Sequence, residues 1–136
     1  MANQQVIVDT SALYALVDRK DPNHQQAAAY LKSVTTLHSL LISNHVFDEV
    51  MTLVKLRLGM QTVMQLGMRL RNSQLIEIFV FSAEDEFATW RLFTHYTDKE
   101  WSYTDCACFA LAQRRKFNQA FTFDHHFVQM GLVAVP

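Results

Sequence analysis

Four carboxylates occupy positions from which they could together bind a metal ion. Asp9 follows the apolar run Val-Ile-Val and Asp124 follows Ala-Phe-Thr-Phe, whereas Glu49 and Asp105 lie in stretches with helical patterning. Carboxylate oxygens in this number suit Mg²⁺ or Mn²⁺ rather than zinc, and no Cys or His spacing argues for zinc. Such a site activates water for attack on a phosphodiester and neutralises the charge that develops there.

Each of these acids also has a simpler structural explanation. Asp is a favoured N-cap residue, and Asp9 and Asp124 both precede predicted helices, so taken singly each is more simply a cap than a ligand. Ser102 and Asp105 have the spacing of a capping box, with Ser102 as the cap. Glu49 could be an ordinary surface glutamate. The metal-site interpretation therefore depends on the four acids converging in space.

A helical wheel separates Glu49 from its acidic neighbour Asp48. On a helix over residues 43–58, Asp48 lies roughly opposite the broad apolar face and should be solvated. Glu49 lies at the margin of that face, between Leu53 and Leu56. We expect its carboxylate to be partly desolvated there and to require a cation.

The elements that must position these acids alternate between strands and helices. We expect strands at residues 6–8, 40–42, 75–81, 120–123 and 132–135. We expect helices at residues 11–17, 24–32, 43–58, 60–71, 83–96 and 104–115, and a short helix from His125. This alternation predicts an α/β fold with three layers, α/β/α, around a central parallel sheet of about five strands. Ligands of such sheets bind beyond the carboxyl ends of the strands, where Asp9 and Asp124 are placed.

The composition is that of a globular protein. With 136 residues, of which 50% are hydrophobic and 18% charged, the chain is expected to form one domain over residues 1–136. The longest apolar runs are too short to span a bilayer, and no signal peptide is visible, so we expect a cytoplasmic protein. The formal net charge of -1 counts against a nucleic-acid surface, although metal ions would partly offset an acidic site. Cys106 and Cys108 are expected to be buried apolar side chains.

Four segments of the chain, in order, resemble the four successive motifs of PIN domains. They are residues 6–14 (VIVDTSALY), 43–50 (SNHVFDEV), 101–107 (WSYTDCA) and 121–131 (FTFDHHFVQMG). The likeness is strongest to the VapC-type toxins of prokaryotic toxin–antitoxin pairs. It implies a metal-dependent endoribonuclease, usually a homodimer, that is held inactive by a cognate antitoxin covering the site.

The resemblance also implies roles for individual residues. Asp9 and Asp105 would be the main Mg²⁺ ligands, and Glu49 and Asp124 would complete the acidic cluster. Ser11 would orient Asp9 or a water molecule, or would only cap its helix, and Thr104 would be a supporting residue beside Asp105. Two alternatives stay open: an RNA-processing PIN nuclease without an antitoxin, and a catalytically silent PIN-like binding module.

Several other residues have two interpretations. His125 and His126 could be a general base or metal ligands, but a short helix after Asp124 does not require them. The series Met60, Met64 and Met68 favours core packing over an interface.

The aromatic and basic residues near the third motif are equally open. Trp101 and Tyr103 could stack a base, although anchoring the loop before Asp105 is the plainer role. The basic cluster at residues 114–116 is expected to be a solvated helix end rather than a contact for RNA phosphates.

Overall fold

The computed structural model describes residues 4–34 and 38–136. Its centre is one parallel sheet of five strands in the order β3-β2-β1-β4-β5. The strands are β1 (Gln4–Val8), β2 (His38–Ser43), β3 (Ile76–Phe79), β4 (Gln119–Phe121) and β5 (Val133–Val135).

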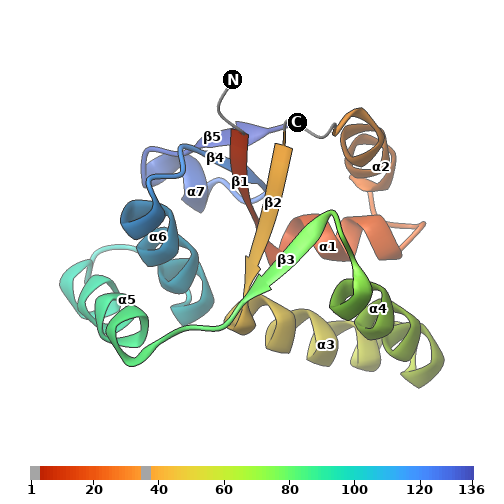
Figure 1. The fold of residues 1–136 in the computed structure, drawn as a ribbon, viewed down its shortest axis with the longest axis horizontal. Helices are drawn as coiled ribbons and strands as arrows, with labels where there is room; N and C mark the ends of the chain where they lie inside the picture. The colour runs from red at the N-terminus through yellow and green to blue at the C-terminus, as the bar shows by residue number, and fades with distance from the viewer. Residues whose placement is uncertain (1–3, 35–37) are drawn as a thin grey trace.

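Helices connect the strands and cover the sheet. They are α1 (Thr10–Val17), α2 (His24–Ser33), α3 (Asn44–Leu58), α4 (Met60–Asn72), α5 (Ala83–His95), α6 (Tyr103–Arg115) and α7 (His126–Gln129). Figure 1 shows α1, α2 and α4 on one side of the sheet and α5, α6 and α7 on the other, with α3 running away below the carboxyl end of β2. The predicted three-layer α/β/α architecture is confirmed.

The central strand β1 is the most deeply buried part of the sheet. Val6, Ile7 and Val8 are all 0% exposed, as expected for a strand covered on both faces. β1 pairs in parallel with β2 on one side and with β4 on the other, so Val8 lies beside Phe121. All these strands therefore end at the same edge of the sheet, and Asp9 follows β1 directly at that edge.

Strands β3 and β4 are shorter than predicted, because the apolar residues at their ends leave the sheet. β3 is shorter than predicted, because Leu75 and Val80 at its two ends are 37% and 73% exposed. β4 ends at Phe121, and the backbone N–H of Phe123 donates to Ser11 Oγ instead of continuing the ladder. The predicted break at Gly59 is confirmed, with a φ of 94° that favours glycine. Among the described helices, none has the length and apolar character needed to cross a membrane.

Candidate active site

Asp9 is a buried carboxylate held by two hydroxyl groups. Its side chain lies at the carboxyl end of β1, where the residue is 4% exposed. Ser11 Oγ donates to Asp9 Oδ2 at 2.8 Å and Thr122 Oγ1 donates to the same oxygen at 2.9 Å. Asp9 precedes α1 as its N-cap residue, but its side chain makes no capping hydrogen bond. The carboxylate is therefore oriented into the site rather than used to start the helix.

The charge of Asp9 is costly in this position. Burial, together with the neighbouring charge of Asp105, raises its pKa to about 6, although hydrogen bonds from Ser11 and Thr122 act in the opposite direction. No ion pair in the described residues neutralises Asp9. A buried carboxylate whose charge lacks compensation fits a bound cation.

Asp105 combines a structural role with a position in the same site. Its Oδ2 accepts from the backbone N–H of Ser102 at 3.0 Å, while Ser102 Oγ accepts from the N–H of Asp105, so the predicted capping box is confirmed. The residue is only 7% exposed. Burial raises the pKa of the Asp105 carboxyl, and the charge of Asp124 adds to this effect. Asp105 therefore starts α6 and also faces a second acid.

Asp124 stands at the start of the turn into α7. Its backbone N–H donates to Thr122 Oγ1 at 3.0 Å, and its Oδ1 accepts from the backbone N–H of His126 at 3.0 Å. This local bond fits the simpler interpretation of Asp124 as a turn residue. Its side chain is nevertheless 29% exposed and faces His126 beside Asp105.

Glu49 differs from the expectation based on the helical wheel. Glu49 is exposed, as is Asp48, and Leu56 beside it is 79% exposed. The expected partial desolvation was wrong, because the margin of the apolar face on α3 is open to solvent. The buried stripe consists only of Val46, Val50 and Val54.

One buried thiol feels the charges of three of the acids. Burial raises the pKa of the Cys108 thiol well above its usual value, and the charges of Asp9, Asp105 and Glu49 raise it further. Cys108 is 0% exposed and both cysteines are free, as predicted. Glu49 therefore belongs to the electrostatic surroundings of Asp9 and Asp105 although its side chain lies at the surface.

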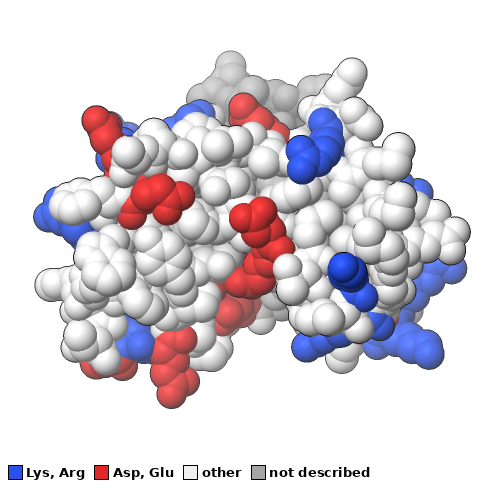
Figure 2. Space-filling view, turned by 90° about the horizontal axis from the view of Figure 1, so that it is seen from below, with Lys and Arg blue, Asp and Glu red and all other residues white. Residues whose placement is uncertain are grey.

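The donor set fits a hard divalent cation. Carboxylate oxygens dominate it, and the most buried acid lacks a compensating charge. Asp124, His125 and His126 also place one potential ligand atom each within 4.8 Å of one another. Figure 2 looks onto this end of the molecule and shows acidic side chains gathered near the centre of the face.

Two residues near the acids were missed or undervalued from the sequence. Thr122 is 3% exposed and bonds both Asp9 and Asp124, and only its place in Phe-Thr-Phe-Asp could have suggested this. His126 Nδ1 lies 3.1 Å from Asp105 Oδ2 and 3.3 Å from Asp124 Oδ1. His125 is 77% exposed, with its Nδ1 3.7 Å from Asp124 Oδ1.

The third motif is anchored by an aromatic residue. Trp101 is 6% exposed, and its indole Nε1 donates to Gln129 Oε1 at 2.9 Å. This burial agrees with the anchoring role and leaves no free indole face for base stacking. Tyr103 is half-buried, with its ring 5.2 Å from that of Phe93. Thr104 is half-buried on the first turn of α6, and none of the hydrogen bonds among the described residues involves its side chain.

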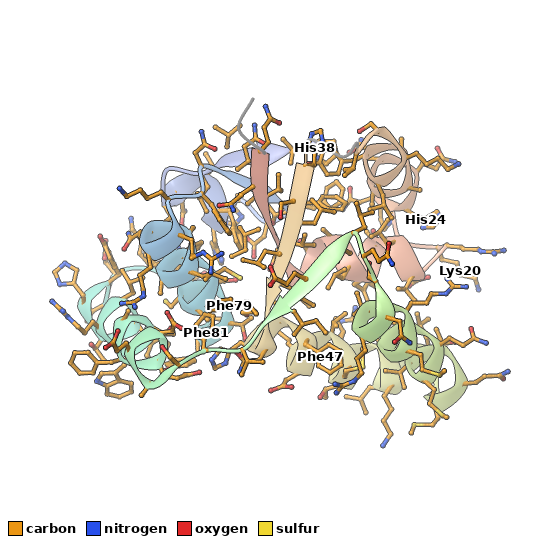
Figure 3. The ribbon with its side chains drawn as sticks, in the orientation of Figure 1. Lys20, His24, His38, Phe47, Phe79 and Phe81 are labelled. Carbon is orange, nitrogen blue, oxygen red and sulfur yellow. The ribbon has the colours of Figure 1, made fainter. Side chains whose placement is uncertain are left out.

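The basic cluster at the end of α6 is less free than predicted. Arg114 Nε lies 2.9 Å from Asp85 Oδ1, which ties α6 to the start of α5. The guanidinium of Arg115 lies 5.2 Å from the ring centroid of Phe79. Figure 3 shows Phe79 and Phe81 close together near the carboxyl end of β3. These two cations are exposed, but they hold neighbouring elements together rather than only ending a helix.

The methionine series on α4 also differs from the prediction. Met60, Met64 and Met68 are 56%, 55% and 63% exposed, so the core-packing interpretation was wrong. With Phe47 and Met51 of α3 they line a groove of about 450 Å³. This surface exposes three methionines side by side and is a candidate contact for another molecule.

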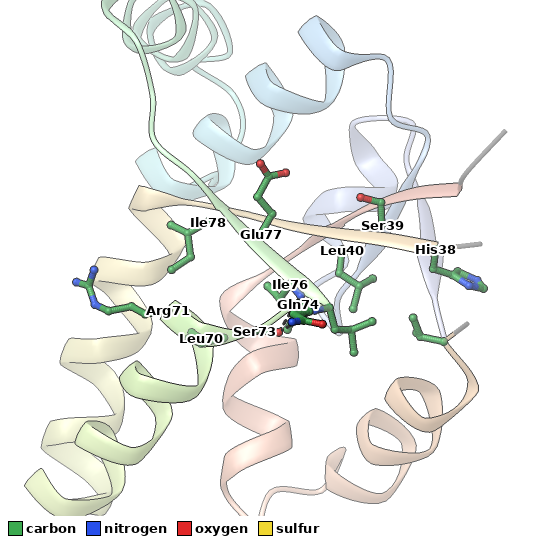
Figure 4. A pocket seen from close by; sticks show the side chains of 12 residues that line it. His38, Ser39, Leu40, Leu70, Arg71, Ser73, Gln74, Ile76, Glu77 and Ile78 are labelled. Carbon is green, nitrogen blue, oxygen red and sulfur yellow. Dashed lines mark hydrogen bonds between the residues drawn. The ribbon is translucent and has the colours of Figure 1, made fainter. Parts of the chain in front are cut away.

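A larger hollow lies elsewhere on the molecule. A hollow of about 950 Å³ is bounded by the first residues of β2 and β3, including His38, Ser39 and Ile76 (Figure 4). It lies toward the amino ends of these strands, whereas the acids follow the carboxyl ends. Glu77 is the one acid among its described lining residues. The cavity is therefore not the carboxylate site.

Comparison with known proteins identifies the family and the fold. The sequence model described as "PIN domain" matches residues 6–132. The chain is 28% identical over 130 residues to the 23S rRNA-specific endonuclease VapC20 of Mycobacterium tuberculosis, covering 96% of this chain and 97% of that protein. It is 30% identical over 123 residues to ribonuclease VapC26 of the same organism, covering 90% and 89%.

Solved structures agree with these sequence matches. The crystal structure of M. tuberculosis VapC20, described as a sarcin-ricin loop cleaving toxin, superposes with a TM-score of 0.87 at 26% identity, covering 94% of this chain and 96% of that one. A toxin-antitoxin complex from Klebsiella pneumoniae contains a chain that superposes with a TM-score of 0.60 at 18% identity, covering 88% and 87%. The second likeness concerns the fold alone.

Proposed function

Because the chain belongs to the PIN-domain family, we propose that it is a divalent-metal-dependent endoribonuclease and the toxin of a toxin–antitoxin pair. Residues 1–136 form one such domain in this proposal. The observation that carries it is the buried charge of Asp9 beside other acids. Among the described residues no cationic side chain pairs with Asp9, and the pKa of its carboxyl is raised to about 6. Such a group is the expected apo form of an acidic metal site.

In the proposed reaction the chain holds the ion and orients the groups around it. Asp9 and Asp105 bind Mg²⁺ or Mn²⁺, and Glu49 and Asp124 complete the acidic cluster. When bound, the ion activates water and neutralises charge on the phosphate. Ser11 and Thr122 both donate to Oδ2 of Asp9, so they fix the plane of the carboxylate that would hold the ion.

The distribution of charge supports an RNA substrate better than the net charge does. Residues 19–71 carry seven of the 12 Lys and Arg but only three of the 13 Asp and Glu. Figure 2 shows basic side chains mostly over the side of the face where α3 and α4 lie, next to the central acids. A basic surface beside an acidic centre suits a phosphate backbone held at a metal site. The likeness to VapC20 supports ribosomal RNA as the substrate.

Protein partners follow from the same family likeness. We propose that an antitoxin protein binds the chain and covers the acidic site. We also propose that the chain forms a homodimer and that it acts in the cytoplasm, where its RNA substrate is found. The exposed methionine groove between α3 and α4 supports a protein partner, because contiguous exposed apolar side chains commonly mark an interface.

The test is cleavage mapping on total bacterial RNA and on intact ribosomes, with Mn²⁺, with Mg²⁺ and with a chelator. The wild-type protein should cleave the large ribosomal RNA at one or a few positions only when the ion is present. Asp9→Asn should lower the rate at least about 100-fold while keeping its fold by circular dichroism, since it removes a ligand.

Three results would contradict this function or part of it. Equal cleavage by the wild type and Asp9→Asn would assign the activity to a contaminant or to another site. Absence of both cleavage and Mn²⁺ binding would favour the silent binding module. Cleavage without any toxicity on expression would favour an RNA-processing enzyme.

A further inference from the structure

His126 places one ring nitrogen between two acids of the site. Its Nδ1 lies 3.1 Å from Asp105 Oδ2 and 3.3 Å from Asp124 Oδ1, and its side chain is only 17% exposed. Asp105 belongs to α6 and Asp124 to the turn after β4, so this ring connects two segments. Among the described residues, no other side chain makes a polar contact with both of these carboxylates.

The chemistry of the neighbours fixes the proton on this nitrogen. Ionised carboxylates only accept hydrogen bonds, so Nδ1 facing them must carry hydrogen. The hydrogen bond to Asp105 is of the charge-assisted kind, which is stronger than a bond between neutral groups. It also offsets the repulsion between two carboxylates that lie close together. A protonated Nδ1 has no lone pair to offer a metal ion.

The backbone around His126 restricts the position of the ring. The N–H of His126 donates to Asp124 Oδ1 at 3.0 Å. The next residue, Phe127, is 0% exposed and packs on Phe109 with ring centroids 4.9 Å apart. The N–H of Leu132 donates to the carbonyl oxygen of Phe127 at 3.1 Å. The short helix α7 is thereby fastened to the core on one side of His126 and to Asp124 on the other.

We propose that His126 is a positioning residue that holds Asp105 and Asp124 at the separation required for metal binding, through the N–H at Nδ1. This inference rests on the proposed nuclease function, since it concerns the same site. His126 neither ligates the ion nor transfers a proton in this scheme. It acts on the reaction only through the two carboxylates that it bonds.

Three substitutions of His126 separate positioning from the other roles. The side-chain nitrogen of Asn is three bonds from Cα, as is Nδ1 of His, so His126→Asn can keep the donor in place. His126→Gln moves the donor one bond further away, and His126→Ala removes it. We expect Ala and Gln to lower both kcat and Mn²⁺ affinity by about 10-fold, the effect typical of groups that orient metal ligands. His126→Asn should recover both to within about threefold of the wild type.

The measurements are RNA cleavage kinetics and calorimetric Mn²⁺ titration, with thermal melts to check folding. If Asn is impaired as much as Ala while both variants fold, the positioning role is wrong and a proton-transfer role takes its place. A histidine ¹⁵N spectrum of the metal-free protein adds a readout independent of activity. It should show His126 protonated at Nδ1, and an unprotonated Nδ1 would overturn the proposal.

His125 provides the matched control, because it is the adjacent histidine and its ring is mostly in solvent. His125→Ala should bind Mn²⁺ within about twofold of the wild type. If it loses as much affinity as His126→Ala, both histidines act as ligands and the positioning proposal fails. Failure of the proposed function is a different result: the wild type itself would neither bind Mn²⁺ nor cleave RNA, whereas the ¹⁵N spectrum would still report the Nδ1 hydrogen bond.

Discussion

Asp9 and Glu49, which we propose belong to one metal site, are built in opposite ways. Asp9 is 4% exposed at the end of the central strand, with two hydroxyl donors on one of its oxygens. Glu49 is exposed on α3, and its side chain makes no hydrogen bond to any of the described residues. The Asp9 carboxylate is therefore fixed before any ion binds, whereas the Glu49 carboxylate is free to move toward a bound ion.

The difference indicates how such a site divides its free-energy costs. For a fixed, buried ligand the free-energy cost of desolvation is incurred during folding, and little side-chain entropy is lost when the ion binds. An exposed glutamate keeps its hydration and its rotamers in the free protein and loses part of both on binding. We therefore expect the two sides of the site to respond very differently to substitution.

The largest effect should come from Asp9 in the metal-free protein. Its folded-state pKa of about 6 lies above the ordinary value of 3.8, so the folded state binds the proton more tightly than the unfolded chain. The associated stability is present below about pH 4 and is lost as the pH rises to about 6, an amount of about 3 kcal/mol. Asp9→Asn should lack this loss and be more stable than the metal-free wild type at pH 8.

Urea unfolding of both proteins between pH 4 and pH 8, with a chelator present, measures this difference directly. If the free energy of unfolding changed with pH in the same way for both proteins, the pKa of Asp9 would not be raised in the folded state. Saturating Mn²⁺ should remove the difference in stability between the two proteins at pH 8, because it stabilises only the wild type.

An intermediate effect should come from a group that orients Asp9. Thr122→Val keeps the shape of a buried side chain but removes the hydroxyl that donates to Asp9 Oδ2. We expect about 10-fold lower kcat/KM and weaker Mn²⁺ binding, as for other groups that orient metal ligands. Thr89→Val is the matched control, because Thr89 is 0% exposed and its hydroxyl donates to the carbonyl oxygen of Asp85, away from the site. Equal losses in the two variants would show a general effect on folding instead.

The smallest effect should come from the exposed side. Glu49→Gln is expected to lower the cleavage rate about threefold to 10-fold, because the solvated carboxylate contributes less than a fixed ligand. Asp48→Asn, at the next position on α3, should change the rate less than about twofold. Cleavage assays at one Mn²⁺ concentration are sufficient for this comparison. If Glu49→Gln were as inactive as Asp9→Asn, the contrast between a fixed and a mobile ligand would be wrong.

Patterns that are local in the sequence predicted the fold well. The Val-Ile-Val run indicated a strand buried on both faces, and the spacing of Ser102 and Asp105 indicated the capping box that is present. Gly59 marked the break between α3 and α4. Each of these signals is contained within a few residues, so the neighbours in the chain are enough to interpret it.

The details of the site depend on contacts that no local window contains. The hydrogen bond from Thr122 to Asp9 joins residues 113 positions apart and exists only because β4 lies beside β1. The sequence pattern correctly predicted a helix around Glu49. The helical wheel could not show that Leu56 is exposed where this helix extends below the sheet. The prediction that Met60, Met64 and Met68 pack in the core was wrong for a similar reason, since apolar spacing does not reveal whether another element covers the helix face.

The position of β4 beside β1 also has a consequence for synthesis. A chain grows from its N-terminus, so β1, β2 and α3 leave the ribosome long before residues 119–126. Until that late segment arrives, β1 lacks its second neighbour, Asp9 lacks Thr122, and Asp105 lacks His126. A nascent chain therefore carries Asp9 and Asp105 with their local partners Ser11 and Ser102 but without Thr122 and His126. The proposed site is complete only after the last strands have joined the sheet.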